Sequence, residues 1–189
     1  MTSNPTKAPV VRTYDTFVAE PVHEETPRHR SYRFVLAATR LSLGWVFLWA
    51  FLDKTFGLGH ETPAEGAWID GGSPTEGFLA NAPTGPFADL YKDIAGAAWA
   101  DWLFMIGLAG IGVALVLGVT MRIAAAAGAT LMIMMWSAVL PPDNNPFMDD
   151  HIVYALVLVA LALAGANKTL GLGRVWERIP VVARYGILK

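Results

Sequence analysis

Four long apolar segments, separated by polar stretches, dominate the hydrophobicity pattern of this chain of 189 residues. They are Phe34–Leu52, Trp102–Met121, Ile123–Leu140 and His151–Ala166. A helix of about 20 apolar residues crosses the roughly 30 Å hydrocarbon core of a bilayer. The pattern therefore predicts an all-α integral membrane protein, built as a four-helix transmembrane bundle. The fourth segment is the shortest, and we expect residues 167–172 or tilted neighbours to complete its span.

The distribution of Lys and Arg along the chain predicts which way the bundle faces. These residues precede the first segment, separate the second from the third, and follow the fourth: Lys7, Arg12, Arg28, Arg30, Arg33, Arg122, Lys168, Arg174, Arg178, Arg184 and Lys189. The connections at 55–101 and 141–150 are acidic, with Lys92 as their single basic residue. Because basic loops remain in the cytoplasm, we expect a multi-pass plasma-membrane protein with cytoplasmic N- and C-termini.

Composition divides the chain into three parts. Residues 1–33 combine prolines and mixed charges with few bulky apolar side chains, which is typical of a segment that cannot offset its ordering entropy. We therefore predict a mobile cytoplasmic tail over 1–33, a domain of four transmembrane helices over 34–172, and a cytoplasmic C-terminal tail over 173–189.

The long connection between the first two segments carries helix signals of its own. Ser73, Pro74 and Glu76 form a capping-box pattern, which predicts a short helix over about Pro74–Ala80. A second short helix is expected over about Pro86–Ala95. Its apolar residues recur at helical spacing: Phe87, Leu90, Tyr91 and Ile94. We expect this stripe on the outer membrane surface or over the mouth of the bundle, because a loop of this length commonly acts as a lid or docking surface.

Two residue classes support membrane-embedded helices. Aromatic side chains that favour the membrane interface fall near the predicted outer boundary: Trp49, Trp99, Trp102, Trp136 and Tyr154. Small residues that allow helices to approach closely recur at four-residue spacing: Gly110, Ala114 and Gly118 in the second segment, and Ala124 and Gly128 in the third.

Arg40 is the most informative charged residue, because it lies about six residues, or roughly 9 Å, inside the first segment. At about 100° per residue, Gly44, Phe47, Phe51 and Lys54 share its helix face. One interpretation is a binding face for an anion or a quinone headgroup, with the two phenylalanines as its apolar wall. The alternative is that Arg40 snorkels to cytoplasmic headgroups and Lys54 marks the outer boundary.

A second polar cluster, Asp149, Asp150 and His151, opens the fourth segment. Carboxylates at a helix N-terminus complement the helix dipole, which is a sufficient structural reason for both aspartates. His151 has two further interpretations: it relays protons, or it joins His60 in a metal site. We favour the capping interpretation and expect no metal.

The chain contains no cysteine, which excludes disulfides, thiolate metal sites, cysteine-ligated iron–sulfur clusters and c-type haem attachment. His151 is the sole histidine within a predicted span, so a membrane haem held by two imidazoles is not expected. Phosphate-binding and dinucleotide-binding glycine loops are absent as well. We expect no haem, no iron–sulfur cluster and no nucleic-acid partner.

Short motifs, taken in their order along the chain, resemble the DoxX family over about residues 33–180. They are Arg40-Leu-Ser-Leu-Gly44 leading to Asp53-Lys54, Gly118-Val-Thr-Met-Arg122, Asn145-Pro-Phe-Met-Asp-Asp-His151 and Gly171-Leu-Gly-Arg174. Gly77-Phe78-Leu79 and Gly85-Pro86-Phe87 in the long loop look like the DoxD branch. Members of that branch are membrane subunits of thiosulfate:quinone oxidoreductase, in which thiosulfate reduces membrane quinone and forms tetrathionate.

The resemblance implies a membrane subunit of a quinone-linked oxidoreductase, with quinone as a substrate. Arg40 and Lys54 would then bind the anion or the quinone oxygens beside Phe47 and Phe51, and His151 would act as the catalytic proton acceptor. Because the chain shows no electron carrier, it would need a partner membrane subunit in the bilayer or direct thiosulfate-to-quinone chemistry. The alternative function is a non-catalytic accessory or assembly subunit of a respiratory membrane complex.

Overall fold

The structure, a computed structural model, describes residues 27–189, and within that range it consists of helices and loops with no strand. The predicted mobile tail lies mostly outside the described residues. Its last part, residues 27–33, forms the first turns of α1 (Pro27–Phe56). The expected boundary at residue 33 therefore falls inside a helix, because a charged exposed turn can extend an apolar helix beyond the bundle.

Four long helices form the body of the protein: α1, α4 (Ala98–Leu117), α5 (Met121–Ala138) and α6 (Asp150–Leu163). The first three are long and apolar enough to cross a membrane, whereas α6 has 14 residues and is shorter. The second predicted span was placed about four residues too late. Gly118 ends α4 because it adopts the left-handed conformation at φ 70°.

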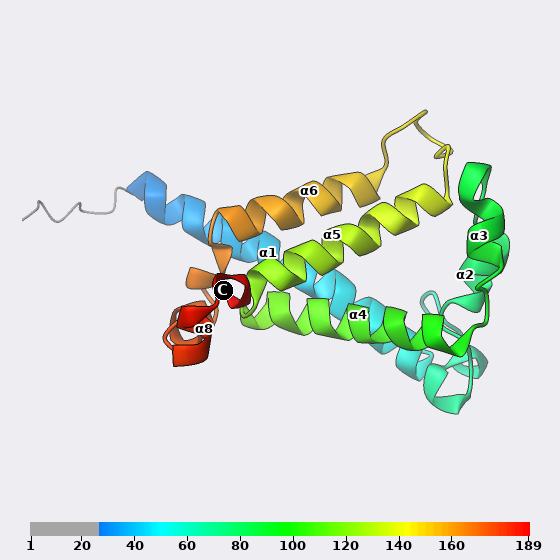
Figure 1. The fold of residues 1–189 in the computed structure, drawn as a ribbon, viewed down its shortest axis with the longest axis horizontal. Helices are drawn as coiled ribbons and strands as arrows, with labels where there is room; N and C mark the ends of the chain where they lie inside the picture. Colours follow the sequence, from blue (N-terminus) through cyan, green and yellow to red (C-terminus); the bar gives the residue numbers. More distant parts are fainter. Residues whose placement is uncertain (1–26) are drawn as a thin grey trace, which may run out of the picture.

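The long helices pack lengthwise, with α1 against α4, α4 beside α5, and α5 against α6 (Figure 1). α1 also contacts α6, which closes the arrangement. The apolar side chains between them are fully or nearly fully buried, and include Leu43, Phe47, Met105, Ile111, Leu115, Met132 and Leu158. The helices thus share one apolar core.

Glycines set the close approach of α1 and α4. A Cβ atom on Gly44 would lie 2.9 Å from Cβ of Leu115, and one on Gly112 would lie 2.8 Å from the backbone nitrogen of Leu48. For Gly110, which the spacing of small residues placed at a helix interface, an added Cβ atom would have no neighbour within 4 Å. The prediction for Gly110 was wrong because small-residue spacing does not tell which face of an apolar helix meets its partner.

The small residues predicted for the third segment do lie at an interface. Ala124 is 3% exposed. A Cβ atom on Gly128 would lie 2.8 Å from Cδ1 of Leu158 on α6. The α5–α6 contact therefore uses Gly128, while Ala124 is buried in the apolar core.

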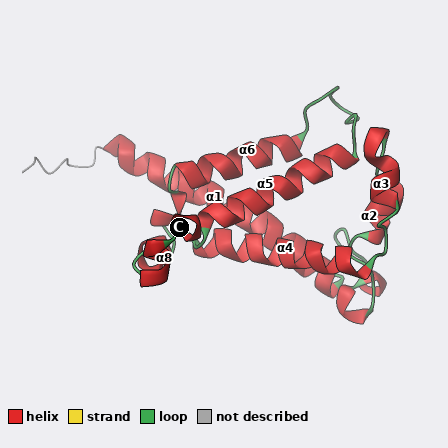
Figure 2. Ribbon diagram, in the orientation of Figure 1, coloured by secondary structure: helices red, strands yellow, loops and turns green. Residues whose placement is uncertain are grey.

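The long loop after α1 folds into short helices that cross one end of the bundle (Figure 2). They are η1 (Ala64–Gly66), η2 (Trp68–Asp70), α2 (Glu76–Asn81), η3 (Gly85–Phe87) and α3 (Ala88–Lys92). Both expected loop helices are present, although each is shorter than predicted. The hydroxyl of Ser73 accepts from the Glu76 N–H at 3.2 Å, as the capping pattern predicted, but the helix begins later than expected and Thr75 is its N-cap.

Hydrogen bonds join these short helices and the residues between them to the C-terminal end of α5. The backbone N–H and hydroxyl of Thr84 donate to the carbonyls of Ala138 and Leu140, at 2.9 and 3.0 Å. The Tyr91 hydroxyl donates to the Met134 carbonyl at 3.0 Å. Leu90 is 63% exposed. The predicted apolar stripe is therefore divided: Tyr91 bonds to the end of α5, while Leu90 faces outward.

The predicted C-terminal tail is folded against the opposite end of the bundle (Figure 1). It contains α7 (Gly173–Trp176), α8 (Pro180–Arg184) and η5 (Gly186–Leu188), and η4 (Ala166–Lys168) precedes it after α6. The Arg122 N–H donates to the Lys189 carbonyl at 3.1 Å. The indole of Trp176 donates to the Leu188 carbonyl at 2.7 Å. The start of α1, the α4–α5 turn and the C-terminus share this end, so the acidic loops lie together at the other.

Candidate functional site

Arg40 is completely buried between the helices. One guanidinium nitrogen, Nη1, donates to the carbonyls of Leu115 and of Val116, the latter at 3.0 Å. The other, Nη2, donates to the carbonyls of Leu170 at 2.7 Å and Thr169 at 3.3 Å. Its acceptors therefore belong to the last turn of α4 and to the segment that follows α6.

This arrangement gives Arg40 a structural role. The last carbonyls of a helix lack partners within the helix, and a cation stabilises the negative end of the helix dipole. Arg40 supplies both the hydrogen-bond donors and the positive charge to the end of α4. It is buried and does not snorkel to the membrane surface as the alternative sequence interpretation expected. An anion or a quinone oxygen would have to displace backbone carbonyls from Nη1 or Nη2. Binding at Arg40 stays a prediction that this geometry does not favour.

Two glycines make room for the Arg40 guanidinium. A Cβ atom on Gly118 would lie 3.1 Å from Nη1, and one on Gly171 would lie 3.0 Å from Nη2. Gly118, Gly171 and Arg40 each open one of the short motifs identified in the sequence. Three motifs that are far apart along the chain thus meet at one buried cation.

Lys54 lies at the other end of α1 from Arg40, 14 residues away. At about 1.5 Å per residue, this separation is roughly 21 Å along the helix axis. A single small anion therefore cannot contact both residues. Phe47 is 2% exposed within the core, whereas Phe51 is only partly buried. The predicted binding face does point inward, but it does not form one site.

Asp53 is a buried charge that was not among the predicted site residues, since it does not share the helix face of Arg40. It is 2% exposed and accepts from the N–H groups of His60, Glu61 and Thr62, at 3.2, 3.1 and 2.9 Å. Asp53 therefore closes the turn that follows α1. A carboxylate at a helix C-terminus opposes the helix dipole, and that conflict was the available signal that it has other donors.

Asp149 and His151 form a hydrogen-bonded pair where α6 begins. Asp149 is the N-cap and accepts from the backbone N–H groups of His151 and Ile152, at 3.1 and 3.4 Å. Its other carboxylate oxygen is 2.7 Å from Nδ1 of His151. The predicted capping role of Asp149 is confirmed. The two side chains are 15% and 21% exposed, so the pair remains accessible.

A carboxylate that accepts from Nδ1–H orients the imidazole and leaves Nε2 to exchange a proton. This pair can therefore hold and pass a proton at the acidic end of the bundle. In the described part of the chain, Asp149, Asp150 and His151 also place three ligand atoms within 4.8 Å of one another. His60 is not part of that cluster; its ring packs edge-on against Trp49, with centroids 5.1 Å apart.

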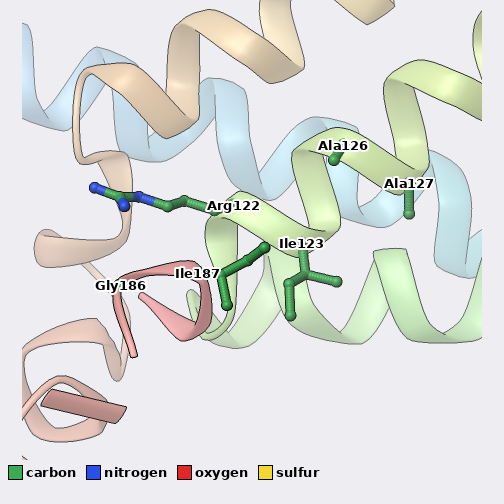
Figure 3. A pocket seen from close by; sticks show the side chains of 6 residues that line it. All are labelled: Arg122, Ile123, Ala126, Ala127, Gly186 and Ile187. Carbon is green, nitrogen blue, oxygen red and sulfur yellow. The ribbon is translucent and has the colours of Figure 1, made fainter. Parts of the chain in front are cut away.

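Two cavities lie away from these residues. An apolar groove of about 450 Å³ runs between the start of α5 and the C-terminal segment, lined by Arg122, Ile123, Ala126, Ala127, Gly186 and Ile187 (Figure 3). A second cavity of about 240 Å³ carries three basic residues, Arg33, Lys168 and Arg174. Neither is lined by Arg40, Lys54 or His151.

Comparison with known proteins identifies a match to one family. The family model described as DoxX matches residues 35–140, which include most of α1, the long loop after it, α4 and α5. The matched region contains Arg40 and Lys54 but ends before His151. Neither a curated protein nor a solved structure matches the chain.

Proposed function

This chain belongs to the DoxX family, and we propose that it is the membrane subunit of a quinone-linked oxidoreductase of the thiosulfate:quinone type. The loop motifs that resemble the DoxD branch support this assignment, and so do the apolar helices. Quinones dissolve in the hydrocarbon of the bilayer, so an enzyme that uses them needs an embedded surface at which to bind them.

The proposal includes a topology in which all four long helices span the plasma membrane and both termini are cytoplasmic. The gathering of the basic segments at one end and of the acidic loops at the other supports it. Trp99 and Trp102, both more than half exposed, lie in the first turn of α4 at the acidic end, where an interfacial belt is expected. The 14 residues of α6 cover roughly 21 Å. The following η4 and local bilayer thinning would complete that span.

The proposed reaction joins two thiosulfate anions into tetrathionate and releases two electrons. A quinone takes up these electrons together with two protons and becomes quinol. The chain has no cysteine and hence no thiol or iron–sulfur carrier of its own. We therefore assign to it quinone binding and proton exchange, while the sulfur chemistry takes place on a partner subunit or directly between thiosulfate and quinone.

The hydrogen bond between Asp149 and His151 is the observation that carries the site proposal. It orients an accessible imidazole at the start of α6, at the acidic end of the bundle. Phe147 and Met148, which are 57% and 48% exposed, precede it and offer an apolar approach for a quinone ring. Lys54, partly buried and 3.9 Å from Glu61, lies in the last turn of α1 at the same end and is the proposed partner for the anion. Phe51, also partly buried, belongs to this secondary proposal.

Thiosulfate-dependent reduction of a quinone analogue in membranes tests this assignment. The substitution His151→Gln should lower the rate of quinone reduction by about a hundredfold at unchanged protein level. A loss of this size is typical when a general acid or base is removed. The same replacement at His60, an exposed histidine of the outer loop, should leave the rate near wild type. A His151→Gln protein that turns over at the wild-type rate would remove His151 from the reaction.

A second function, that of a non-catalytic accessory or assembly subunit of a respiratory complex, is favoured by the geometry of Arg40. Its two terminal nitrogens are occupied by backbone carbonyls, as expected for a structural rather than a substrate-binding cation. Purification in mild detergent followed by mass spectrometry tests this second function. An accessory subunit co-purifies with other subunits, so a chain recovered alone would exclude this function.

A further inference from the structure

The basic cavity defined by Arg33, Lys168 and Arg174 is built from segments far apart in the sequence. Arg33 comes from α1, Lys168 from η4 and Arg174 from α7. Thr169 also lines it, and its hydroxyl accepts from Nε of Arg33 at 3.1 Å. The carbonyl of the same Thr169 accepts from Arg40 at 3.3 Å. Arg40 therefore helps to hold the Thr169 wall of this cavity in place.

We propose that this basic cavity binds the phosphate group of an anionic phospholipid from the cytoplasmic leaflet. The proposal rests on the membrane topology and is independent of any quinone chemistry. Basic pockets between transmembrane helices on the cytoplasmic side are suited to such headgroups, and each nearby Lys or Arg strengthens the attraction.

The charges around the cavity favour an anion. Among residues 27–189, its lining contains three basic residues and no carboxylate. Glu177, an acid beside the cavity, is 3.7 Å from Nζ of Lys168 and also accepts from Nδ2 of Asn167 at 3.1 Å. Lys168 is 53% exposed, and an exposed ion pair of this kind is weak enough for a phosphate to compete with it.

The apolar surroundings favour a lipid over a soluble anion. Leu36 and Ala166 line the cavity beside the charges. Val35 and Leu163, next to the cavity-lining residues Leu36 and Ala164 in the chain, are 63% and 84% exposed. Such side chains offer a surface along which acyl chains can lie once the phosphate is held. Charge at the rim and an apolar flank match the two halves of a phospholipid.

Native mass spectrometry of the full-length, detergent-solubilised protein tests the proposal. Phosphatidylglycerol and phosphatidylcholine are titrated separately, and inorganic phosphate serves as the soluble competitor. Wild-type protein should retain phosphatidylglycerol in preference to phosphatidylcholine. The double variant Lys168→Gln/Arg174→Gln should bind phosphatidylglycerol at least roughly tenfold more weakly, because two cations near the headgroup are lost.

The matched control is Arg178→Gln/Arg184→Gln, which removes the same charge from exposed positions of the C-terminal segment that do not line the cavity. It should bind phosphatidylglycerol as the wild type does. Equal weakening in both double variants would show a diffuse surface charge and overturn the proposal. Displacement of the lipid by millimolar inorganic phosphate would also overturn it, in favour of a soluble-anion site.

Discussion

The guanidinium of Arg40 donates to the carbonyl of Leu170 at 2.7 Å, across 130 positions of the chain. This contact joins the first long helix to the segment that leaves the last one. The same guanidinium also donates to the carbonyls of Leu115 and Val116 at the end of α4. One buried side chain thus links three segments at the basic end of the bundle.

Removing Arg40 should destabilise the protein. Arg40→Ala would leave a cavity and several buried carbonyls without donors, at a cost of about 3 kcal/mol or more. Thermal unfolding of the purified protein in detergent should show this loss, while Arg30→Ala, on an exposed turn of α1, should not. An Arg40→Ala protein of wild-type stability that had lost only thiosulfate-dependent activity would instead place Arg40 in a binding site.

Enlarging Gly112 should separate α1 from α4. A leucine there would drive its Cβ atom to 2.8 Å from the Leu48 nitrogen, and overpacking of this kind costs about 1–3 kcal/mol. Gly110→Leu is the matched control, because a Cβ atom at that position meets no atom within 4 Å. The two variants should differ clearly in melting temperature. Equal destabilisation would contradict the interface described above.

Asp101 should hold the loop between α1 and α4 in place. Its carboxylate accepts from the Ser73 hydroxyl at 2.9 Å and from the Thr75 N–H and hydroxyl at 3.1 and 2.6 Å. Asp101→Ala should release this part of the loop and accelerate its cleavage by protease added from the outer side. Asp93→Ala removes an exposed carboxylate nearby and should leave cleavage unchanged. Identical digestion of the two variants would show that Asp101 does not hold the loop.

The absence of native cysteine makes the membrane topology directly measurable, because one introduced cysteine is a unique label site. A membrane-impermeant maleimide should label Asp143→Cys, in the α5–α6 loop, on intact cells. It should label Arg178→Cys, in the C-terminal segment, only after the membrane is permeabilised. Labelling of both sites on intact cells would show that α6, the one long helix between them, does not cross the membrane.

The apolar pattern alone was sufficient to place the long helices, because burial of apolar side chains in lipid or in a core is a local property of each segment. Local hydrogen bonds were predictable for the same reason. Ser73 and Asp149 each accept from backbone N–H groups only a few residues away. It was not predictable that Gly112, and not Gly110, faces α1, because this depends on the rotation of α4 against α1.

By itself, the sequence determined that this protein is helical, apolar and divided into basic and acidic ends, since these properties follow from local composition and periodicity. Only the tertiary structure decided what its buried charges do. Arg40 could be located on a helix face from the sequence, but its acceptors lie as far as 130 positions away. A charge removed from water takes whichever partners the packing of distant segments brings within reach, and that packing is a property of the whole fold.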